Sequence, residues 1–261
     1  MKRIQSILLL LLSLSTLTFA QSRQQQSLPK KDKTYSVGGV SFTMKYVKGG
    51  SFLMGATKEM GAHDKDEVVH KATVKSFYLG ETEVTQELWQ AVMGKNPSKY
   101  HFKNNPVEWV TWDDCQEFIK KLNALTRQHF RLPTEAEWEF AARGGCYSHH
   151  YAYAGSNDLS EVAWWGKNAE WQGLKHQEVK KKKPNELGLY DMTGNVSEWC
   201  QDYYNPYGTS GMQKPSNLAR RNFRIIRGGS YCHDEYYSRI SNRNIFIHWR
   251  HDDNLGLRLA Q

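Results

Sequence analysis

The stretch from Pro184 to Asp202 carries the residue types and spacing best suited to chemistry in this chain. Turn-forming glycines and asparagines alternate in it with apolar and aromatic residues, and neither a helical nor a strand period runs through it. It therefore predicts a folded loop held by its own side chains. Asp191, Glu198 and Asp202 are spaced among backbone carbonyls freed by the turns, and calcium binds carboxylate and carbonyl oxygens together. The alternative is a glycine turn whose carboxylates accept hydrogen bonds from nearby backbone N–H groups.

Cysteines offer a second kind of chemistry, and the chain has four of them: Cys115, Cys146, Cys200 and Cys232. They are few for a disulfide scaffold of this length, and the three complete pairings that four cysteines allow stay open. Cys115 falls on an apolar stripe with the spacing i, i+3, i+4, i+7, which favours a buried core thiol over a reactive one.

The N-terminus has the pattern of a secretory signal over residues 1–20. Lys2 and Arg3 precede an apolar run, and Thr18-Phe19-Ala20 supplies a small-residue cleavage pattern. The run is too short to span a bilayer comfortably and no second apolar stretch follows, so we expect an exported protein that does not span the membrane, in the periplasm or outside the cell. Residues 21–39 are expected to form a flexible leader, because the first of them are almost all polar.

The formal net charge is +8, and the excess base is spread along the chain apart from a cluster at Lys180–Lys183. Lysines on a solvated loop explain this cluster better than an anionic partner does, and no nucleic-acid-binding motif accompanies it. Aromatic residues make up 13% of the chain, with 9 Trp and 14 Tyr. They either pack the loops of a fold poor in regular structure against one another or line a binding cleft.

The local pattern predicts a mixture of short strands and capped helices. Residues 42–47 and 51–54 flank Lys48-Gly49-Gly50 and predict a β-hairpin, and residues 72–79 predict a strand. Three helices are expected after the N-caps Thr85, Thr111 and Thr134, and two late strands at 224–227 and 255–259. With no internal repeat, one compact α+β domain with much irregular coil fits best.

Seven stretches carry a resemblance to a known family. They are G-G-S-F-L-M-G (49–55), E-T-E-V-T-Q-E-L-W (81–89), N-P-V-E-W-V-T-W-D-D (105–114), R-L-P-T-E-A-E-W-E-F-A-A-R-G-G (131–145), G-L-Y-D-M-T-G-N-V-S-E-W (188–199), R-G-G-S-Y (227–231) and N-L-G-L-R-L-A (254–260). In this order they resemble the formylglycine-generating enzymes, or sulfatase-modifying factors. The resemblance implies a domain over residues 40–261 with a C-type-lectin-like fold and a shallow peptide cleft. It also implies structural calcium, and oxidation of a substrate cysteine by O2 at a copper(I) ion held by two thiolates.

The calcium expectation transfers to one loop of this chain. The positions that resemble the family's ligands are the side chains of Asp191 and Glu198 and the backbone carbonyls of Gly194 and Val196. A second calcium site of the family has no clear acidic counterpart within residues 162–180. Arg258, in the last of the seven stretches, is expected to be a structural salt-bridge partner rather than a catalytic group.

The copper expectation does not transfer, because the two-thiolate motif is broken. The chain reads G-G-S-Y-C-H-D-E-Y-Y-S over residues 228–238. Without a gap, His233 and Ser238 occupy the two thiolate positions; with a one-residue gap, Cys232 matches the first and Tyr237 the second. Copper(I) held in a linear site needs two soft ligands, and neither register supplies a pair. Copper is therefore doubtful.

Three residues nevertheless remain candidates for a catalytic or binding cleft: Ser230, Cys232 and His233. Ser230 resembles a cleft serine that binds peptide backbone, and as a nucleophile it has no base partner that the sequence identifies. Cys232 has plainer alternatives, an inert thiol or a disulfide with Cys200.

Two functions from different classes follow. The first is a non-oxidase that binds peptide, protein or polymer through an aromatic cleft. The second is a diverged metal-dependent oxidase that uses Cys232 with His233 to oxidise a cysteine of a protein substrate with O2. A shared fold does not choose between them.

Overall fold

The first sheet lies near the N-terminal end of the fold and joins strands β1 (Lys33–Val37), β2 (Val40–Val47) and β5 (Phe77–Gly80) in the antiparallel order β1-β2-β5. The computed structural model describes residues 31–170, 173, 175–205 and 218–261, and residues 31–261 form one compact unit. β1 shows that residues 33–37, expected in the leader, belong to the fold. This mostly polar stretch contains an aromatic residue, Tyr35, which attaches it to the fold: its ring stacks on Phe42, with ring centroids 5.6 Å apart. The expected signal segment lies outside the described residues.

The expected hairpin over residues 42–54 is wrong. β3 (Gly50–Met54) pairs with β4 (His70–Val74) in a separate two-stranded sheet, while β2 pairs with β1 and β5. Gly49 lies where the chain crosses from one sheet to the other: a Cβ there would come within 2.5 Å of the Val74 carbonyl oxygen. The expected strand at 72–79 divides at the same crossing into β4 and β5. Both elements therefore break where two chain segments pass in close contact.

The three helices expected from N-caps are confirmed as α1 (Gln86–Met93), α2 (Trp112–Thr126) and α3 (Glu135–Ala142). The Thr111 and Thr134 hydroxyls each accept a hydrogen bond from the backbone N–H three residues on, and the acid at that position reaches back to the cap. The remaining helical elements are short: 3-10 turns at Lys58–Met60, Gly145–Tyr147 and Leu218–Asn222, α4 at Leu159–Val162 and α5 at Gly166–Glu170.

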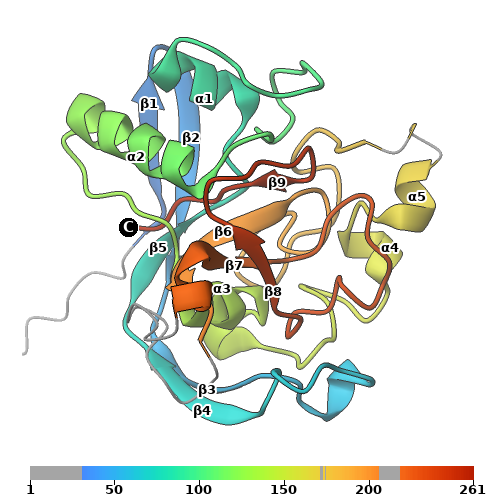
Figure 1. Cartoon of the computed structure of the whole chain (residues 1–261). Coiled ribbons are helices and arrows are strands. Elements are labelled where there is room, and N and C mark those ends of the chain that lie inside the picture. Colours follow the sequence, from blue (N-terminus) through green and yellow to red (C-terminus); the bar gives the residue numbers. More distant parts are fainter. Residues whose placement is uncertain (1–30, 171–172, 174, 206–217) are drawn as a thin grey trace, which may run out of the picture. The chain divides into compact units, whose positions relative to one another are not determined.

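A four-stranded sheet forms the centre of the fold, in the order β8 (Asn244–Ile247), β7 (Phe223–Arg227), β6 (Ser197–Tyr203) and β9 (Leu255–Gly256) (Figure 1). β6 runs parallel to β9 and antiparallel to β7. The loop expected over 184–202 is thus wrong in its second part, which is strand. Its first four strand residues are all buried, and a strand covered on both faces shows no alternation in its sequence.

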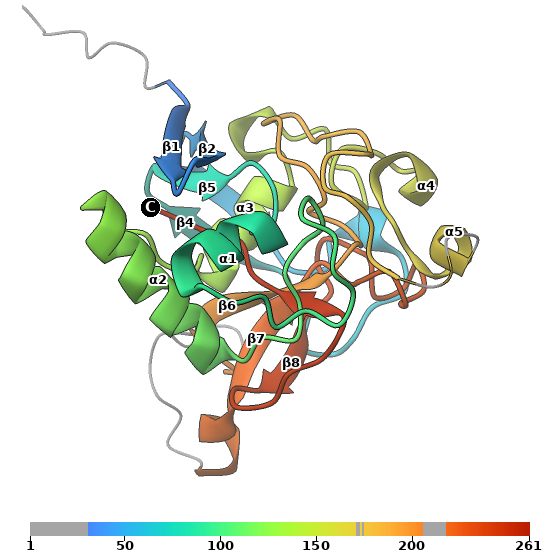
Figure 2. The ribbon, with the colours of Figure 1, turned by 90° about the horizontal axis from the view of Figure 1, so that it is seen from above.

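Two apolar cores flank these sheets. One packs α1 and α2 against β1 and β2, with Trp89 stacked on Phe118 at 4.7 Å, and Figure 2 shows the two helices side by side next to these strands. Cys115 is fully buried in this core, as expected. The other core surrounds Trp138 of α3 and includes Cys200. Among the described residues, no helix is both long and apolar enough to cross a bilayer.

Candidate functional site

Ser230, Cys232 and His233 lie together in the segment that follows β7. The chain turns sharply there through Gly228 and Gly229, both with positive φ, and a Cβ at Gly229 would come within 2.8 Å of the Tyr237 carbonyl oxygen. This turn buries Ser230 completely and leaves Cys232 exposed. We call the group of Ser230, Cys232 and His233 the Cys232 site.

A row of hydrogen bonds joins the side chains of the Cys232 site. The Ser230 hydroxyl lies 3.3 Å from Cys232 Sγ and 2.9 Å from His233 Nδ1, and Asn254 Nδ2 donates to the same sulfur at 3.1 Å. Burial lowers the pKa of His233, against the opposing charges of Asp234 and Asp252, so the imidazole is neutral at pH 7. In the tautomer with Nδ1 unprotonated, this nitrogen can accept the hydrogen bond of the serine hydroxyl. Ser230 thus lies beside an imidazole that could serve as a base partner, and Cys232 is the exposed thiol of the group.

The suggested Cys200–Cys232 disulfide is wrong, because all four cysteines are unpaired. Cys200 is fully buried in the core around Trp138, and burial raises the pKa of its thiol well above the usual value. Cys232 is exposed.

The donor set at the Cys232 site does not fit a two-thiolate copper centre. Ser238 is fully buried and its hydroxyl donates to the Asp234 carbonyl at 2.9 Å. Tyr237 is 41% exposed, with its ring 5.3 Å from that of His233. Whichever of the two residues takes the second thiolate's place, the site offers one sulfur where linear copper(I) needs two.

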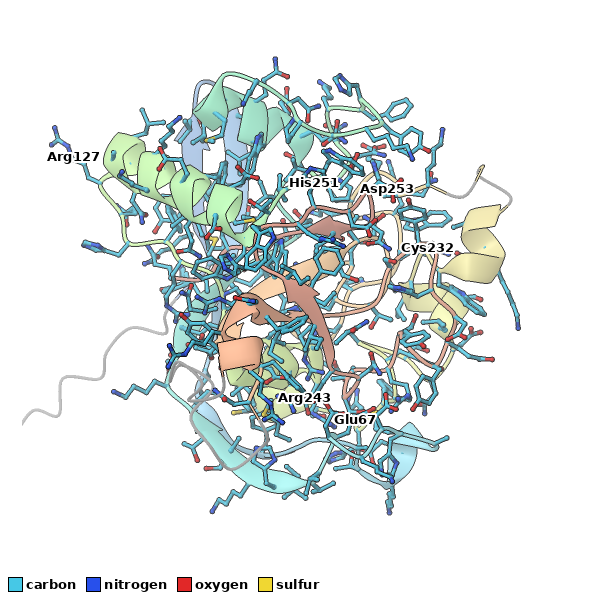
Figure 3. All side chains as sticks on the ribbon, viewed as in Figure 1. Glu67, Arg127, Cys232, Arg243, His251 and Asp253 are labelled. Atoms are coloured by element: carbon cyan, nitrogen blue, oxygen red, sulfur yellow. The ribbon has the colours of Figure 1, made fainter. Side chains whose placement is uncertain are left out.

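The segment 251–254 connects the Cys232 site with an exposed aromatic ring. His251 packs against Trp109 with ring centroids 4.3 Å apart, and Asp253 accepts a hydrogen bond from the Tyr231 hydroxyl at 3.1 Å. Figure 3 shows His251, Asp253 and Cys232 following one another across the same side of the fold. Trp109 is 39% exposed and has φ +62°, a conformation that costs a non-glycine residue free energy and recurs at binding sites. Sequence spacing gave no signal for Asn254, which reaches Cys232 from another segment, or for Trp109, which packs against His251.

Glu198, one of the four residues expected to bind calcium, is the partner of a buried arginine. Arg258 donates to both Glu198 oxygens through Nε, at 2.9 and 3.0 Å, and to Oε1 through an NH2 group at 2.7 Å. Trp138 Nε1 adds a further bond to Glu198 Oε2 at 2.7 Å. The expectation that Arg258 is a structural salt-bridge partner is therefore confirmed.

Asp191 has a buried carboxylate oxygen that a bound cation would satisfy. Its Oδ2 accepts the Lys180 backbone N–H at 2.9 Å, while its buried Oδ1 has no hydrogen-bond partner among the described residues. Burial raises the pKa of Asp191 to about 6, although the Lys180 N–H and the Arg258 charge oppose this. Gly194 has φ +78°, and a Cβ there would come within 2.3 Å of the Trp164 carbonyl oxygen, so only glycine fits this turn.

Glu83 is a member of this acidic group that sequence reasoning missed. It is buried, and its pKa is raised well above the usual value by burial and by the negative charges of Asp191 and Glu198. Val196, whose carbonyl was expected to bind calcium, donates its N–H to Glu83 Oε1 at 3.1 Å. In the described part of the chain, no three His, Cys, Asp or Glu side chains are placed to hold a metal by themselves. A calcium ion here would need backbone carbonyls as well, and the four-residue set stays a prediction.

Comparison with known proteins shows the family and the fold of the chain. The model of the sulfatase-modifying factor enzyme 1-like domain matches residues 31–261. The chain therefore belongs to the sulfatase-modifying factor family, and its mixed α/β domain has that family's C-type-lectin-like fold.

Three relatives show how far the similarity extends. The chain is 32% identical to the chaperone protein LppX of Paenibacillus barcinonensis, over 77% of this chain and 83% of that protein. The structure of Treponema denticola variable protein 1 matches with a TM-score of 0.77 and 34% identity, over 89% of this chain and 99% of that one. The formylglycine-generating enzyme of Streptomyces coelicolor is 36% identical, over 60% of this chain and 52% of its own length. The similarity to the enzyme thus spans about half of that protein.

Proposed function

We propose that this chain is a non-oxidising member of its family that binds an extended polypeptide at the surface around Cys232 and Trp109. The observation that carries the proposal is the single sulfur of the Cys232 site, where buried Ser238 or exposed Tyr237 stands in the place of a second thiolate. The Cys232 site lacks the pair of thiolates that would hold copper(I) for the oxidation of a substrate cysteine. What the site retains is an exposed surface with rings and hydrogen-bonding groups.

The chemistry of this surface suits a polypeptide. Trp109 and Tyr237 present large apolar area with a polar edge at little cost in side-chain entropy, the properties of aromatic anchors in interfaces. Asp253 belongs to the segment that packs against Trp109 and pairs with Lys99 at 2.6 Å, so both signs of charge are present. A relative named a chaperone, similar over 83% of its length, supports a ligand that is an unfolded chain.

Binding is tested with reduced, carboxymethylated lactalbumin, an unfolded chain without free thiols, by fluorescence anisotropy. Trp109→Ala and Tyr237→Ala are each expected to weaken binding about tenfold, because an aromatic anchor contributes roughly 1–2 kcal/mol. Tyr147→Ala is the matched control: Tyr147 is 62% exposed but belongs to the 3-10 turn at Gly145–Tyr147, outside the Cys232 site. It should leave affinity within twofold. Equal losses in all three variants, or no binding by the wild type, would contradict the proposal.

The hydrogen-bonded row in the Cys232 site favours a second candidate, a diverged metal-dependent oxidase. Ser230 joins the Cys232 sulfur to His233 Nδ1 through two hydrogen bonds, so two groups that can bind metals, a thiol and an imidazole, lie in one row. A metal held by one thiolate and one imidazole differs from the family's linear site. This candidate needs a partner ligand that the described residues do not place beside Cys232.

Copper(I) titration of the reduced protein without oxygen, against a chromogenic chelator, separates the two functions. We expect no stoichiometric uptake, and no oxygen consumption when copper and a cysteine-containing peptide are supplied. Cys232→Ser and Cys146→Ser are the paired variants, since both replace an exposed thiol. The oxidase would be established if the protein took up copper stoichiometrically and consumed oxygen, and if Cys232→Ser lost this uptake while Cys146→Ser kept it. That result would contradict the non-oxidising function.

A further inference from the structure

A cavity of about 870 Å³ lies between the β3–β4 sheet, α3 and the turn that follows α3, and none of its described lining residues belongs to the Cys232 site. Figure 1 shows β3 and β4 next to α3, in the lower part of the picture. Gly50 at the start of β3 allows these elements to approach closely: a Cβ there would come within 3.2 Å of Cys146 Sγ and 3.4 Å of the Phe140 ring. Small-molecule sites usually measure roughly 300–1,000 Å³, so this cavity, which we call the β3 cavity, has the size of a ligand site.

The inner surface of the β3 cavity is largely apolar. The rings of Phe52 and Phe140 line it and lie 5.2 Å apart. Leu53 and Val69 line it as well, although they are 55% and 42% exposed. Burying aliphatic side chains is favourable, and exposed ones gathered at a concave site mark the place of a ligand. An apolar group in the cavity would remove both Leu53 and Val69 from water.

The charges that line the β3 cavity leave one positive charge over. Two cations and one acid belong to the lining: Lys58, Arg143 and Glu59. Arg143 lies 3.6 Å from Glu59 and also donates to Glu139 Oε1, at 2.9 Å through Nε and at 2.8 Å through an NH2 group. Lys58 is exposed and has no ion-pair partner within the described ranges. A cation without a counter-charge beside an apolar cavity raises the local concentration of anions and orients them.

We infer that the β3 cavity binds a small organic acid whose apolar body covers the Phe52 and Phe140 rings and whose anionic group pairs with Lys58. The apolar body provides most of the affinity, because it takes Leu53 and Val69 out of water. The charge selects acids over neutral molecules of the same shape. The inference does not rest on the function of the Cys232 site, and the outcome at one site does not decide the outcome at the other.

Two fluorescent probes with the same rings test the charge. 1-Anilinonaphthalene-8-sulfonate carries an anionic group, and N-phenyl-1-naphthylamine lacks it. The wild type is expected to bind a single molecule of the sulfonate. Lys58→Gln should bind the sulfonate about tenfold more weakly, the loss of one charged contact, while its affinity for the neutral probe changes by no more than about twofold. Lys121→Gln, which removes an exposed charge from α2, is the matched control and should bind both probes like the wild type.

Two leucines test the apolar part of the site. Leu53→Ala should weaken the binding of both probes about fivefold, because the ligand then covers less aliphatic surface, whereas Leu125→Ala should change it by no more than about twofold. The two leucines are 55% and 59% exposed, so neither substitution removes packing from the core. Leu125 belongs to α2 and is the matched control.

The Cys146 thiol reports directly whether the cavity is occupied. Cys146 is exposed and lines the cavity, while Cys232 is exposed and lies outside it, so the same molecule carries its own control. A saturating concentration of the sulfonate should slow the alkylation of Cys146 by iodoacetamide several-fold and leave the rate at Cys232 unchanged. Mass spectrometry of the two cysteine-containing peptides measures both rates.

The inference would be overturned in any of four ways. A wild type that binds neither probe has no such site. Equal losses in Leu53→Ala and Leu125→Ala would place the probes elsewhere, and so would alkylation of Cys146 that the sulfonate does not slow. A Lys58→Gln variant that binds the sulfonate like the wild type, or that loses affinity for both probes equally, would contradict an anionic ligand.

Discussion

Replacing Arg258 with alanine is expected to lower the free energy of unfolding by about 3–5 kcal/mol, the cost of leaving one partner of a buried ion pair alone. Arg258 is fully buried, and besides Glu198 it donates to two backbone carbonyls, Gly80 O at 2.9 Å and Tyr190 O at 2.8 Å. The substitution would leave the buried Glu198 carboxylate with the Trp138 N–H alone and without a countercharge, and would remove one donor from each of the two carbonyls. Urea denaturation followed by tryptophan fluorescence measures the change.

A partly exposed pair of the same type provides the control. Arg131 contacts Glu137 through two hydrogen bonds at 2.6 and 2.7 Å, but 39% of the Arg131 side chain is exposed. Water can replace the lost contacts there, so Arg131→Ala should cost no more than about 1 kcal/mol. If the two alanine variants lost equal stability, burial would not be the source of the Arg258 effect.

The helices could be predicted because the signals that start them are local. Thr111 and Asp114 are three residues apart, as are Thr134 and Glu137, and each pair satisfies N–H groups of its own first turn. Such signals start a helix whatever part of the protein the helix packs against. Strand pairing depends instead on distant segments, and nothing near residues 48–50 shows that β2 and β3 enter different sheets.

The candidate site likewise has one part that the local sequence predicted and one part that depends on distant segments. Ser230, Cys232 and His233 are neighbours in sequence, and the structure brings their side chains together. Asn254 reaches Cys232 from a remote segment, and Trp109 packs against His251 of that same segment, so no spacing could reveal either residue. The loop ending at Glu198 was recognised as a polar site, but the partners of the Glu198 carboxylate, Arg258 and Trp138, each lie 60 residues away along the chain.

Asp202 should make the protein less stable as the pH rises from 5 to 8. Burial raises the pKa of Asp202 to about 7, and repulsion from Glu135 and Glu137 adds to it, while the Glu135 backbone N–H and Arg243 oppose it. The folded state then holds a proton that the unfolded chain releases near pH 4. The stabilising proton is fully present below pH 4 and is lost as the pH rises towards 7. Relative to Asp202→Asn, the wild type should lose roughly 2–3 kcal/mol of unfolding free energy between pH 5 and pH 8.

Arg243 lowers the pKa of Asp202 but does not cancel this effect. Its guanidinium donates to both oxygens of Glu135, at 2.7 and 2.9 Å, so part of its charge is already matched by that carboxylate. Urea denaturation at pH 5 and pH 8 measures the difference between wild type and Asp202→Asn. Glu117→Gln, on the exposed side of α2, should reproduce the pH dependence of the wild type. If Asp202→Asn ran parallel to the wild type at both pH values, Asp202 would be ionised throughout, and Arg243 would have to be shared between the two acids.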